Sequence, residues 1–238
     1  MTIRNARTGE KIRLRVLVID VGGTNVKILA SGFNEVRRFS SGPELTPPQL
    51  IKGVRNMTAG LKYDVVTIGC PAPVVHNKLV LEPVNLGGGW LDYDFNNAFG
   101  RPVKLVNDAA MQAIGSYQGG RMLFLGLGTG LGTAAIFDNV VIPMEAGHLP
   151  YRRSTFEDHI GIRGLKHFGK KRWRELVADV VARLMAALTA EYVVLGGGHV
   201  KFLKELPAGA RAGNNANAFK GGFRLWEEPE RFVLYKGR

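Results

Sequence analysis

The sequence has one cysteine, few acidic side chains and no long apolar run. Cys70 stands alone, which excludes an internal disulfide and a zinc site built from several cysteines. No apolar run approaches the ~18 residues that a membrane span needs, so we expect no membrane partner. Residues 1–13 form a short basic leader without an apolar signal core, which predicts a cytoplasmic protein.

Acidic residues are outnumbered: 20 Asp and Glu stand against 32 Lys and Arg, a formal net charge of +12. This excess favours a polyanionic partner, such as nucleic acid, an acidic membrane or a phosphate-rich substrate. The alternative is a basic surface that only meets solvent. The basic side chains gather between residues 152 and 174, which makes this region the candidate polyanion track; its central candidates are Lys170, Lys171 and Arg172.

The order of apolar runs and turn signals predicts an α/β protein. With 238 residues the chain is long enough for one large domain or two small ones. We expect a helix over 46–61, because Thr46 is a capping residue and two prolines follow it. The other expected elements are strands within 14–30 and over 35–40, 64–69, 79–81, 103–106, 122–127, 131–137 and 192–195, helices over 109–117 and 174–189, and a short helix ending at 203.

The stretch 16–29 reads as strand, tight turn and strand, and the rest of the chain is organised around it. Its first apolar run ends in Asp20, which could hold a divalent cation through water. Gly22 and Gly23 then turn the chain; we expect the turn to need backbone angles that a Cβ would forbid, and its N–H groups to approach a phosphate. Further candidates for contacting that phosphate are Thr24, Asn25 and Lys27. The alternative is an ordinary hairpin whose glycines serve only the turn.

The same pattern recurs over residues 122–137, where Gly128, Thr129 and Gly130 lie in the turn. A strand follows these glycines and their spacing differs from G-x-G-x-x-G, so neither a dinucleotide fingerprint nor a Walker lysine is present. Two copies about half a chain apart predict two related lobes that grip phosphates between them.

Together these motifs resemble the actin-like ATPase and sugar-kinase superfamily, and within it the ROK family of sugar kinases. The two glycine turns look like its phosphate loops, and Glu145-Ala146-Gly147-His148 matches the E-x-G-H motif. Asn107-Asp108-Ala109 matches the catalytic N-D-A motif, and Asn85-Leu86 with Trp90 is similar to the N-L-x-x-W sugar loop with one extra residue. The resemblance covers roughly residues 14–225. It implies a ribonuclease H-like fold of two lobes, 1–112 and 113–238, with a ligand cleft between them.

One departure from the family narrows the resemblance. ROK kinases usually carry a cysteine-rich zinc motif after E-x-G-H, and this sequence has none there. With both phosphate loops intact, the chain resembles the polyphosphate glucokinase branch. We therefore expect no zinc, and we expect His148 to contact sugar only.

Asp108 is the candidate catalytic base. A sugar hydroxyl that attacks a terminal phosphate loses its proton as the new bond forms, and a carboxylate facing the cleft suits that work. The local sequence favours another role, because Asn-Asp before an Ala-rich helix is good N-capping chemistry. The phosphate loops and the E-x-G-H motif shift the balance to catalysis.

The resemblance implies a set of ligand contacts. For the hexose these are Asn85, Asn107, Asp108, Glu145, His148 and Glu157. The turn of Gly196, Gly197 and Gly198 is expected to border the nucleoside or the polyanion. The alternatives are a surface loop after Pro143 for Glu145 and His148, and a plain strand-to-helix turn for the three glycines.

We therefore expect a kinase that moves a terminal phosphoryl group from polyphosphate, ATP or both to a hexose, with glucose 6-phosphate as the first product to test and Mg²⁺ on the donor phosphates. The alternatives are an ATP-only hexose or N-acyl-aminosugar kinase and a non-catalytic sugar-binding protein. Nucleic acid is not an expected partner, since only about fifteen residues precede the first strand, too few for a helix-turn-helix. A homodimer stays open.

Overall fold

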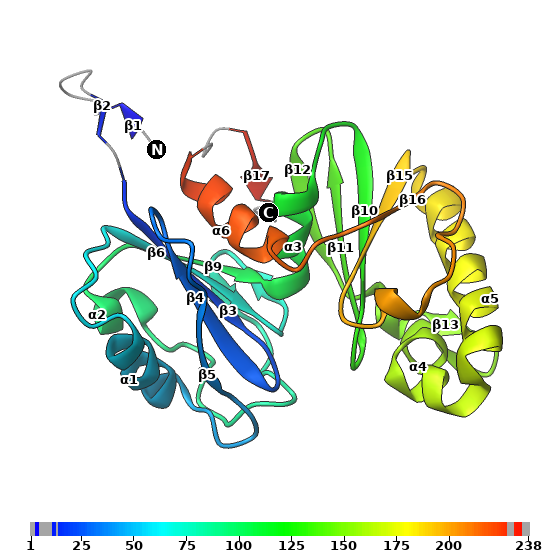
Figure 1. The fold of residues 1–238 in the computed structure, drawn as a ribbon, viewed down its shortest axis with the longest axis horizontal. Helices are drawn as coiled ribbons and strands as arrows, with labels where there is room; N and C mark the ends of the chain where they lie inside the picture. Colours follow the sequence, from blue (N-terminus) through cyan, green and yellow to red (C-terminus); the bar gives the residue numbers. More distant parts are fainter. Residues whose placement is uncertain (1–2, 5–10, 13, 228–230, 235–238) are drawn as a thin grey trace.

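The computed structural model describes residues 3–4, 11–12, 14–227 and 231–234. Most of the basic leader expected over 1–13 lies outside these residues. Two β-sheets stand side by side, and the helices α3 (Asp108–Ser116) and α6 (Asn217–Glu227) lie between them (Figure 1). In the described part of the chain, no helix is long and apolar enough to cross a bilayer.

The first sheet contains the expected hairpin at its centre. Its strands run in the order β5–β4–β3–β6–β9. β3 pairs antiparallel with β4 and parallel with β6, and helix α1 (Pro47–Met57) makes the crossover between β5 and β6. The strands are β3 (Val16–Val21), β4 (Asn25–Ala30), β5 (Arg37–Ser40), β6 (Val65–Cys70) and β9 (Val103–Asn107).

The second sheet repeats this topology. Its order is β12–β11–β10–β15–β16, with β17 added beside β12. β10 pairs antiparallel with β11 and parallel with β15, and the crossover to β15 carries the helices α4 (Phe156–Ile160) and α5 (Ile162–Leu188). The two lobes are therefore related, as the repeated glycine turns predict. The strands are β10 (Arg121–Leu127), β11 (Leu131–Phe137), β12 (Val140–Met144), β15 (Tyr192–Gly196), β16 (Ala210–Ala212) and β17 (Val233–Leu234).

Several short strands and helices lie in the connections between the main strands and helices. Two small hairpins are β7 (Val74–Val75) with β8 (Lys78–Leu79), and β13 (Pro150–Tyr151) with β14 (Ser154–Thr155). The remaining pieces are β1 (Ile3–Arg4), β2 (Lys11–Ile12), α2 (Phe95–Phe99), η1 (Ala146–His148) and η2 (Val200–Phe202).

Asn77, in the turn between β7 and β8, completes the edge of the first sheet. Its side-chain oxygen accepts a hydrogen bond from the Leu105 N–H at 2.6 Å, and its Nδ2 donates to the Val103 carbonyl at 3.0 Å. One amide thus satisfies two backbone groups of the edge strand β9.

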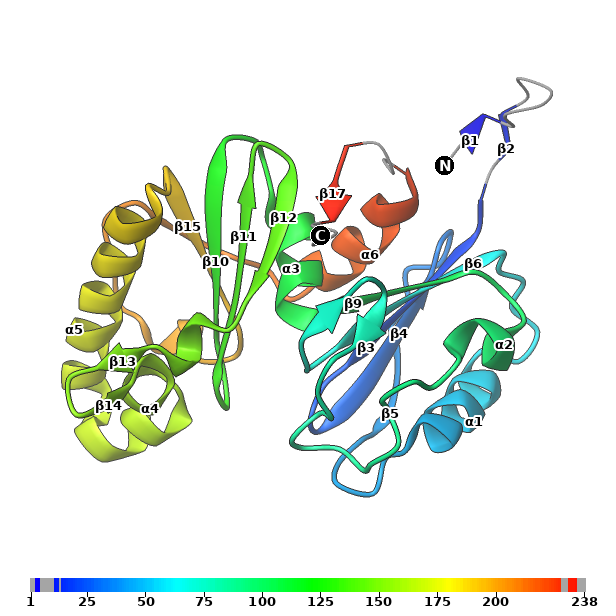
Figure 2. The same cartoon turned by 180° about the vertical axis from the view of Figure 1, so that it is seen from behind.

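Three apolar layers hold the sheets and helices together. Side chains alternate along a strand, so Val16 and Val18 of β3 enter the central layer around α3 and α6, whereas Leu17 and Ile19 enter the outer layer under α1. In the second sheet, Phe124 of β10 joins the central layer. The alternate side chains of the same strand, Leu123, Leu125 and Leu127, pack under α5. Figure 2 shows α1 and α5 on opposite flanks of the molecule. Burial on both faces explains why the strands read as continuous apolar runs.

Several element predictions are wrong in their bounds. Helix α1 ends at Met57, before the expected Leu61, since Thr58 caps it through the Val54 carbonyl. Only Leu79 of the expected strand 79–81 is in β8. Helix α5 begins at Ile162 rather than near residue 174, with a break at Gly169, where φ is 70°.

The crossing of α3 and α6 depends on glycine. A Cβ on Gly115 would lie 1.8 Å from the Asn217 carbonyl oxygen, and a Cβ on Gly221 would lie 1.8 Å from that of Met111. Helix α6 also packs on the first sheet, where Thr67 donates to the Gly222 carbonyl at 2.8 Å. The boundary expected at 112/113 falls inside α3, and a helix from the end of the chain packs on the first lobe.

Replacing Gly115 with Ala tests this close approach. The added methyl cannot fit without separating the helices, so we expect the free energy of unfolding to fall by about 1–3 kcal/mol or more, measured by urea denaturation. Gly88→Ala is the control, because a Cβ there meets no atom within 4 Å. Equal stability of the two variants would contradict the packing described.

Candidate active site

The first glycine turn is tight and open to solvent. The Gly22 N–H donates to the Asn25 carbonyl at 3.0 Å, and Ser41 Oγ donates to the Gly22 carbonyl. Neither Gly22 nor Gly23 has a positive φ, so the expectation that the turn needs glycine backbone angles is wrong. Space limits Gly22 instead, because a Cβ there would lie 3.2 Å from the Asn25 oxygen, whereas a Cβ on Gly23 would make an ordinary contact with Asn85 at 3.4 Å. The structure thus brings the candidate sugar residue Asn85 to the first glycine turn.

The second glycine turn is held by Glu157. The Leu131 N–H donates to Glu157 Oε2 at 3.0 Å, and a Cβ on Gly130 would lie 2.3 Å from that oxygen. The Ile162 N–H donates to the Thr129 carbonyl at 3.3 Å, which joins the loop to the start of α5. A carboxylate expected to bind sugar therefore also shapes the phosphate loop.

The turn of Gly196, Gly197 and Gly198 lies beside the second loop. β15 runs parallel to β10, with Gly196 opposite Gly126. Gly197 has a φ of 85°, and a Cβ on it would lie 2.3 Å from the Leu127 oxygen. The His199 N–H donates to that same oxygen at 3.0 Å. Glycine is required here for both conformation and space.

Asp108, Asp20 and Glu145 meet where the lobes join. The pKa of Asp108 is raised to about 7, chiefly by burial and also by the charges of Asp20 and Glu145, while the hydrogen bond from the Ala109 N–H works in the opposite direction. Burial also raises the pKa of Asp20, against the pull of Lys27, whose Nζ lies 3.5 Å from Asp20 Oδ2. The arrangement is an acidic cluster in which burial raises the pKa of all three carboxyl groups.

The capping role falls to Asn107 rather than to Asp108. Asn107 Oδ1 accepts from the Ala110 N–H at 3.1 Å, and its Nδ2 donates to the Ala72 carbonyl at 3.2 Å. Asp108 is the first residue of α3, and its Oδ1 accepts from the Ala109 N–H at 2.8 Å. Among the described residues, the Asp108 carboxylate bonds only to N–H groups at the start of α3, so it and one N–H of the Asn107 amide retain capacity for a ligand.

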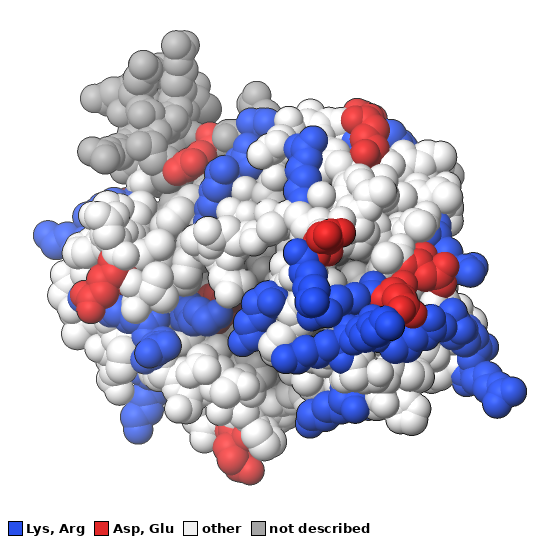
Figure 3. Space-filling view, turned by 45° about the vertical axis from the view of Figure 1, so that its right-hand side comes forward, with Lys and Arg blue, Asp and Glu red and all other residues white. Residues whose placement is uncertain are grey.

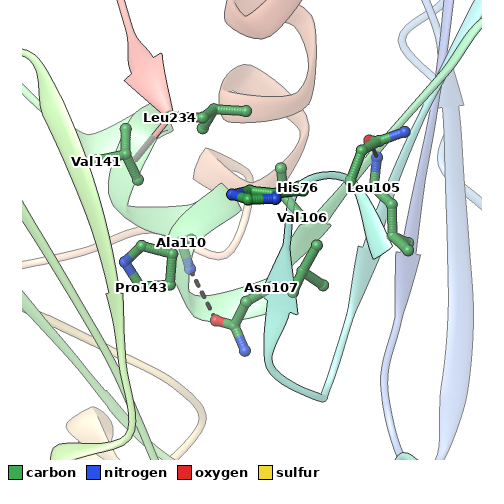
Figure 4. Close-up of a pocket in the computed structure, with 10 residues that line it drawn as sticks. His76, Leu105, Val106, Asn107, Ala110, Val141, Pro143 and Leu234 are labelled. Atoms are coloured by element: carbon green, nitrogen blue, oxygen red, sulfur yellow. Dashed lines mark hydrogen bonds between the residues drawn. The ribbon is translucent and has the colours of Figure 1, made fainter. Parts of the chain in front are cut away.

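Asn107 also borders an apolar cavity of about 420 Å³ (Figure 4). His76 and Val106 come to it from the first lobe, and Val141 and Pro143 come from β12 of the second. The cavity therefore lies between the lobes, beside the start of α3.

The E-x-G-H motif is anchored to the second sheet through its buried middle residues, whereas Glu145 and His148 are exposed. The Ala146 N–H donates to Thr133 Oγ1 at 3.0 Å, and the His148 N–H donates to the Glu145 carbonyl at 3.1 Å. Burial raises the pKa of Glu145, His148 lowers it and Glu157 raises it. Glu145 and His148 of this motif, with Glu157 from α4, thus lie within electrostatic reach of one another.

Of the three consecutive candidates Lys170, Lys171 and Arg172 on α5, Lys170 and Arg172 have different neighbours. They follow the break at Gly169, and Lys170 Nζ lies 4.8 Å from the Phe202 ring, whereas Arg172 pairs with Glu175 at 2.5 Å. Lys201 also lies over the Phe202 ring, at 5.2 Å. Sequence reasoning does not single out Lys201 and Phe202, since no motif covers them. Figure 3 shows Lys and Arg gathered in a band where the second lobe comes forward.

Metal-binding groups are few at this site. Within the described ranges, no three His, Cys, Asp or Glu side chains are placed to hold a metal ion. The pair Asp20 and Asp108 offers oxygen ligands of the kind that suits Mg²⁺ held through water and substrate phosphates.

The sequence profile of the ROK family matches residues 16–161, more than half of the chain. The chain belongs to the ROK family. No curated protein sequence matches this ROK chain. Its two lobes have the actin-like ATPase fold, which the solved structures of other ROK proteins share.

Three solved structures illustrate the likeness. Inorganic polyphosphate/ATP-glucomannokinase from Arthrobacter sp. strain KM is 22% identical, with a TM-score of 0.77 over 91% of this chain and 100% of that one. A ROK family glucokinase from Streptomyces griseus, in complex with glucose and AMPPNP, is 14% identical, with a TM-score of 0.73 over 89% and 98%. A ROK family transcriptional regulator, homologous to the E. coli MLC protein, is 12% identical, with a TM-score of 0.70 over 90% and 78%. At such low identities, the TM-scores show a shared fold and nothing finer.

Asp108→Asn tests the buried carboxyl without reference to activity. The pKa of Asp108 rises from 3.8 to about 7 on folding, so its protonated form contributes stability that is lost as pH rises through about 7. An asparagine at this position keeps a side-chain oxygen that accepts from the Ala109 N–H. It carries no charge at any pH, so it avoids the loss of stability on deprotonation. In buffer without divalent cations, we expect the variant to gain more Tm over wild type at about pH 8.5 than at about pH 5. Exposed Glu205→Gln is the control; an equal gain at both values would contradict the raised pKa.

Proposed function

We propose that this ROK protein is a sugar kinase, which transfers a terminal phosphoryl group from inorganic polyphosphate or ATP to a hexose. Glucose is the hexose that we propose as its substrate. The observation that carries the proposal is the half-buried carboxylate of Asp108, with a pKa of about 7, at the joint between two glycine turns. A general base works best when its pKa lies near the working pH.

In the proposed reaction, the sugar hydroxyl donates its proton to the carboxylate of Asp108 while its own oxygen bonds to the terminal phosphorus. The bond from that phosphorus to the bridging oxygen breaks, and the electron pair leaves with ADP or the shortened polyphosphate. The exposed turn residues Gly23, Thr24 and Asn25 lie where backbone N–H groups can hold the donor phosphates. Mg²⁺, held through water at Asp20, would neutralise charge on those phosphates.

The hexose would lie among polar groups of both lobes. Asn85 and the free N–H of Asn107 come from the first lobe, and Glu145, His148 and Glu157 come from the second. Binding sugar between groups of both lobes favours their closure, which excludes water from the reacting phosphate.

The cations beside Gly197 support polyphosphate as a donor. Lys170 and Lys201 both lie over Phe202, close to the turn that borders the second phosphate loop. An extended chain of phosphates needs repeated cationic contacts, and the net charge of +12 supplies them. The Arthrobacter glucomannokinase carries both donors in its name.

The apolar cavity beside Asn107 favours a second candidate, an N-acyl-aminosugar kinase. A volume of about 420 Å³ has room for an acyl group, and Val106, Ala110 and Val141 line it. A protein from Listeria monocytogenes with this fold is named a putative N-acetylmannosamine kinase, at 13% identity and a TM-score of 0.73 over 91% of this chain and 100% of that one.

Coupled sugar-phosphate formation, with each donor and each sugar tried separately, tests the proposal. We expect turnover with glucose, and we expect Asp108→Asn to cut kcat by at least ~10²-fold while sugar affinity stays within a few-fold. Sugar binding measured by calorimetry separates the two quantities. Unchanged turnover would remove Asp108 as the base, and sugar binding without turnover in wild type would leave a non-catalytic sugar-binding protein.

The donor side has its own test. Lys170→Ala combined with Lys201→Ala removes two cations near Phe202, so we expect KM for polyphosphate to rise ~10-fold or more and KM for ATP to rise less. Lys52→Ala with Lys62→Ala removes the same charge from an exposed part of the first lobe. Equal losses with both donors would contradict a polyphosphate contact at this position.

A further inference from the structure

A second basic site lies on another side of α5. A pocket of about 700 Å³ is bordered by the β13–β14 hairpin, α4 and α5. Four arginines line it, against one acid, Asp158; we call it the arginine pocket, and its cations are Arg152, Arg153, Arg163 and Arg172. None of these belongs to the phosphate loops or to the cluster around Phe202.

Two of the arginines form the turn of a hairpin. β13 and β14 pair from Pro150 to Thr155, so Arg152 and Arg153 are the two turn residues. Arg152 has a φ of 56°, in the left-handed region that arginine rarely adopts. Within the described residues, Arg153 makes no hydrogen bond or ion pair. A cation without a partner thus faces a pocket that other cations share.

The floor of the pocket is aromatic and fixed. His159 Nδ1 lies 2.8 Å from the Thr155 carbonyl, and its ring stacks on Phe168 at 5.5 Å. Both rings line the pocket with Leu176. A packed floor under exposed arginines suits a ligand site, because the guanidinium groups can close on an anion while the floor stays in place.

Arg163 connects this pocket to the candidate active site. One of its guanidinium nitrogens lies 3.3 Å from Glu157 Oε1 and 2.9 Å from Asp158 Oδ1. The other oxygen of Glu157 holds the Leu131 N–H of the second phosphate loop. The Arg163 side chain is 69% exposed, so it can leave these acids for a stronger anion.

We propose that the arginine pocket binds a phosphoryl dianion, and that the bound anion draws Arg163 away from Glu157. Guanidinium groups hold phosphoryl oxygens in pairs. Arg163 already pairs with Glu157 and Asp158, and Arg172 pairs with Glu175, so the charge that no acid compensates lies on the hairpin turn, at Arg153 above all. Two sources share this chemistry, the hexose phosphate product and a short inorganic phosphate chain. The pocket then regulates the kinase, and this second half rests on the proposed function of Glu157 in holding the hexose.

Binding is tested by calorimetry with inorganic pyrophosphate and with glucose 6-phosphate, at constant ionic strength with sulfate as the reference anion. We expect one of the two probes to bind more tightly than sulfate, and Arg153→Gln with Arg172→Ala to weaken it at least ~10-fold. Lys52→Ala with Lys62→Ala should bind like wild type. Arg153→Gln alone, which breaks no contact of the described residues, should weaken binding several-fold and leave Tm unchanged.

Three outcomes would overturn the site: binding no tighter than that of sulfate, equal losses in the two double variants, or no loss in Arg153→Gln. The first shows that an adventitious ion only is held there, and the second shows a general charge effect. The choice between glucose 6-phosphate and pyrophosphate identifies the source of the ligand.

The regulatory half is tested by kinetics. With the better probe present, we expect KM for the hexose to rise several-fold with little change in kcat, because Glu157 loses its cationic neighbour. Arg163→Gln should show the raised KM without the probe and no further response to it. A KM that ignores the probe, while binding stands, overturns the coupling; absence of any turnover with binding intact overturns the proposed function and leaves the anion site.

Discussion

The carboxylate of Asp108 lies in a position that disfavours its negative charge, and the neighbouring elements hold it there. Asp20 and Glu145 are both close enough to raise its pKa, and burial does the same. Repulsion among these acids is offset by the N–H groups at the start of α3. One of them, the Ala109 N–H, donates a hydrogen bond to Asp108 Oδ1 at 2.8 Å. A helix shared by both sheets is therefore the support that holds an unfavourable charge in one position.

The two lobes share more than a topology. Their inner faces pack on the same pair of helices, α3 and α6, so the central apolar layer belongs to neither lobe alone. Gly115 and Gly221 let the two helix backbones approach each other closely. Each lobe contributes one glycine turn, and the shared layer joins the two lobes that carry the turns.

The fold was predictable where local and global signals agree. The strands around Asp20 and before Gly128 are buried on both faces, so their apolar runs identify them directly. Helix α6 was missed because Gly221 and Gly222 lower its propensity, although both are needed for packing against α3 and β3.

The motifs of the candidate site were predictable from the sequence, but the contacts that explain why each residue stands in its position were not. Gly130 serves close approach to Glu157, which no local pattern records. The run Lys170-Lys171-Arg172 reads as one basic track, but the break at Gly169 and the helical period direct Lys170 and Arg172 to different neighbours. Contacts of this kind depend on tertiary structure, as does the link from Arg163 to Glu157.

The amide of Asn77 has a consequence for assembly. An open strand edge invites pairing with a second molecule, and such pairing can propagate into fibres. By binding the Val103 carbonyl and the Leu105 N–H, this one side chain occupies the groups that an incoming strand would use. Asn96 Oδ1 accepts from the Val103 N–H at 2.8 Å as well, so two asparagine side chains leave an incoming strand fewer groups to pair with at this edge.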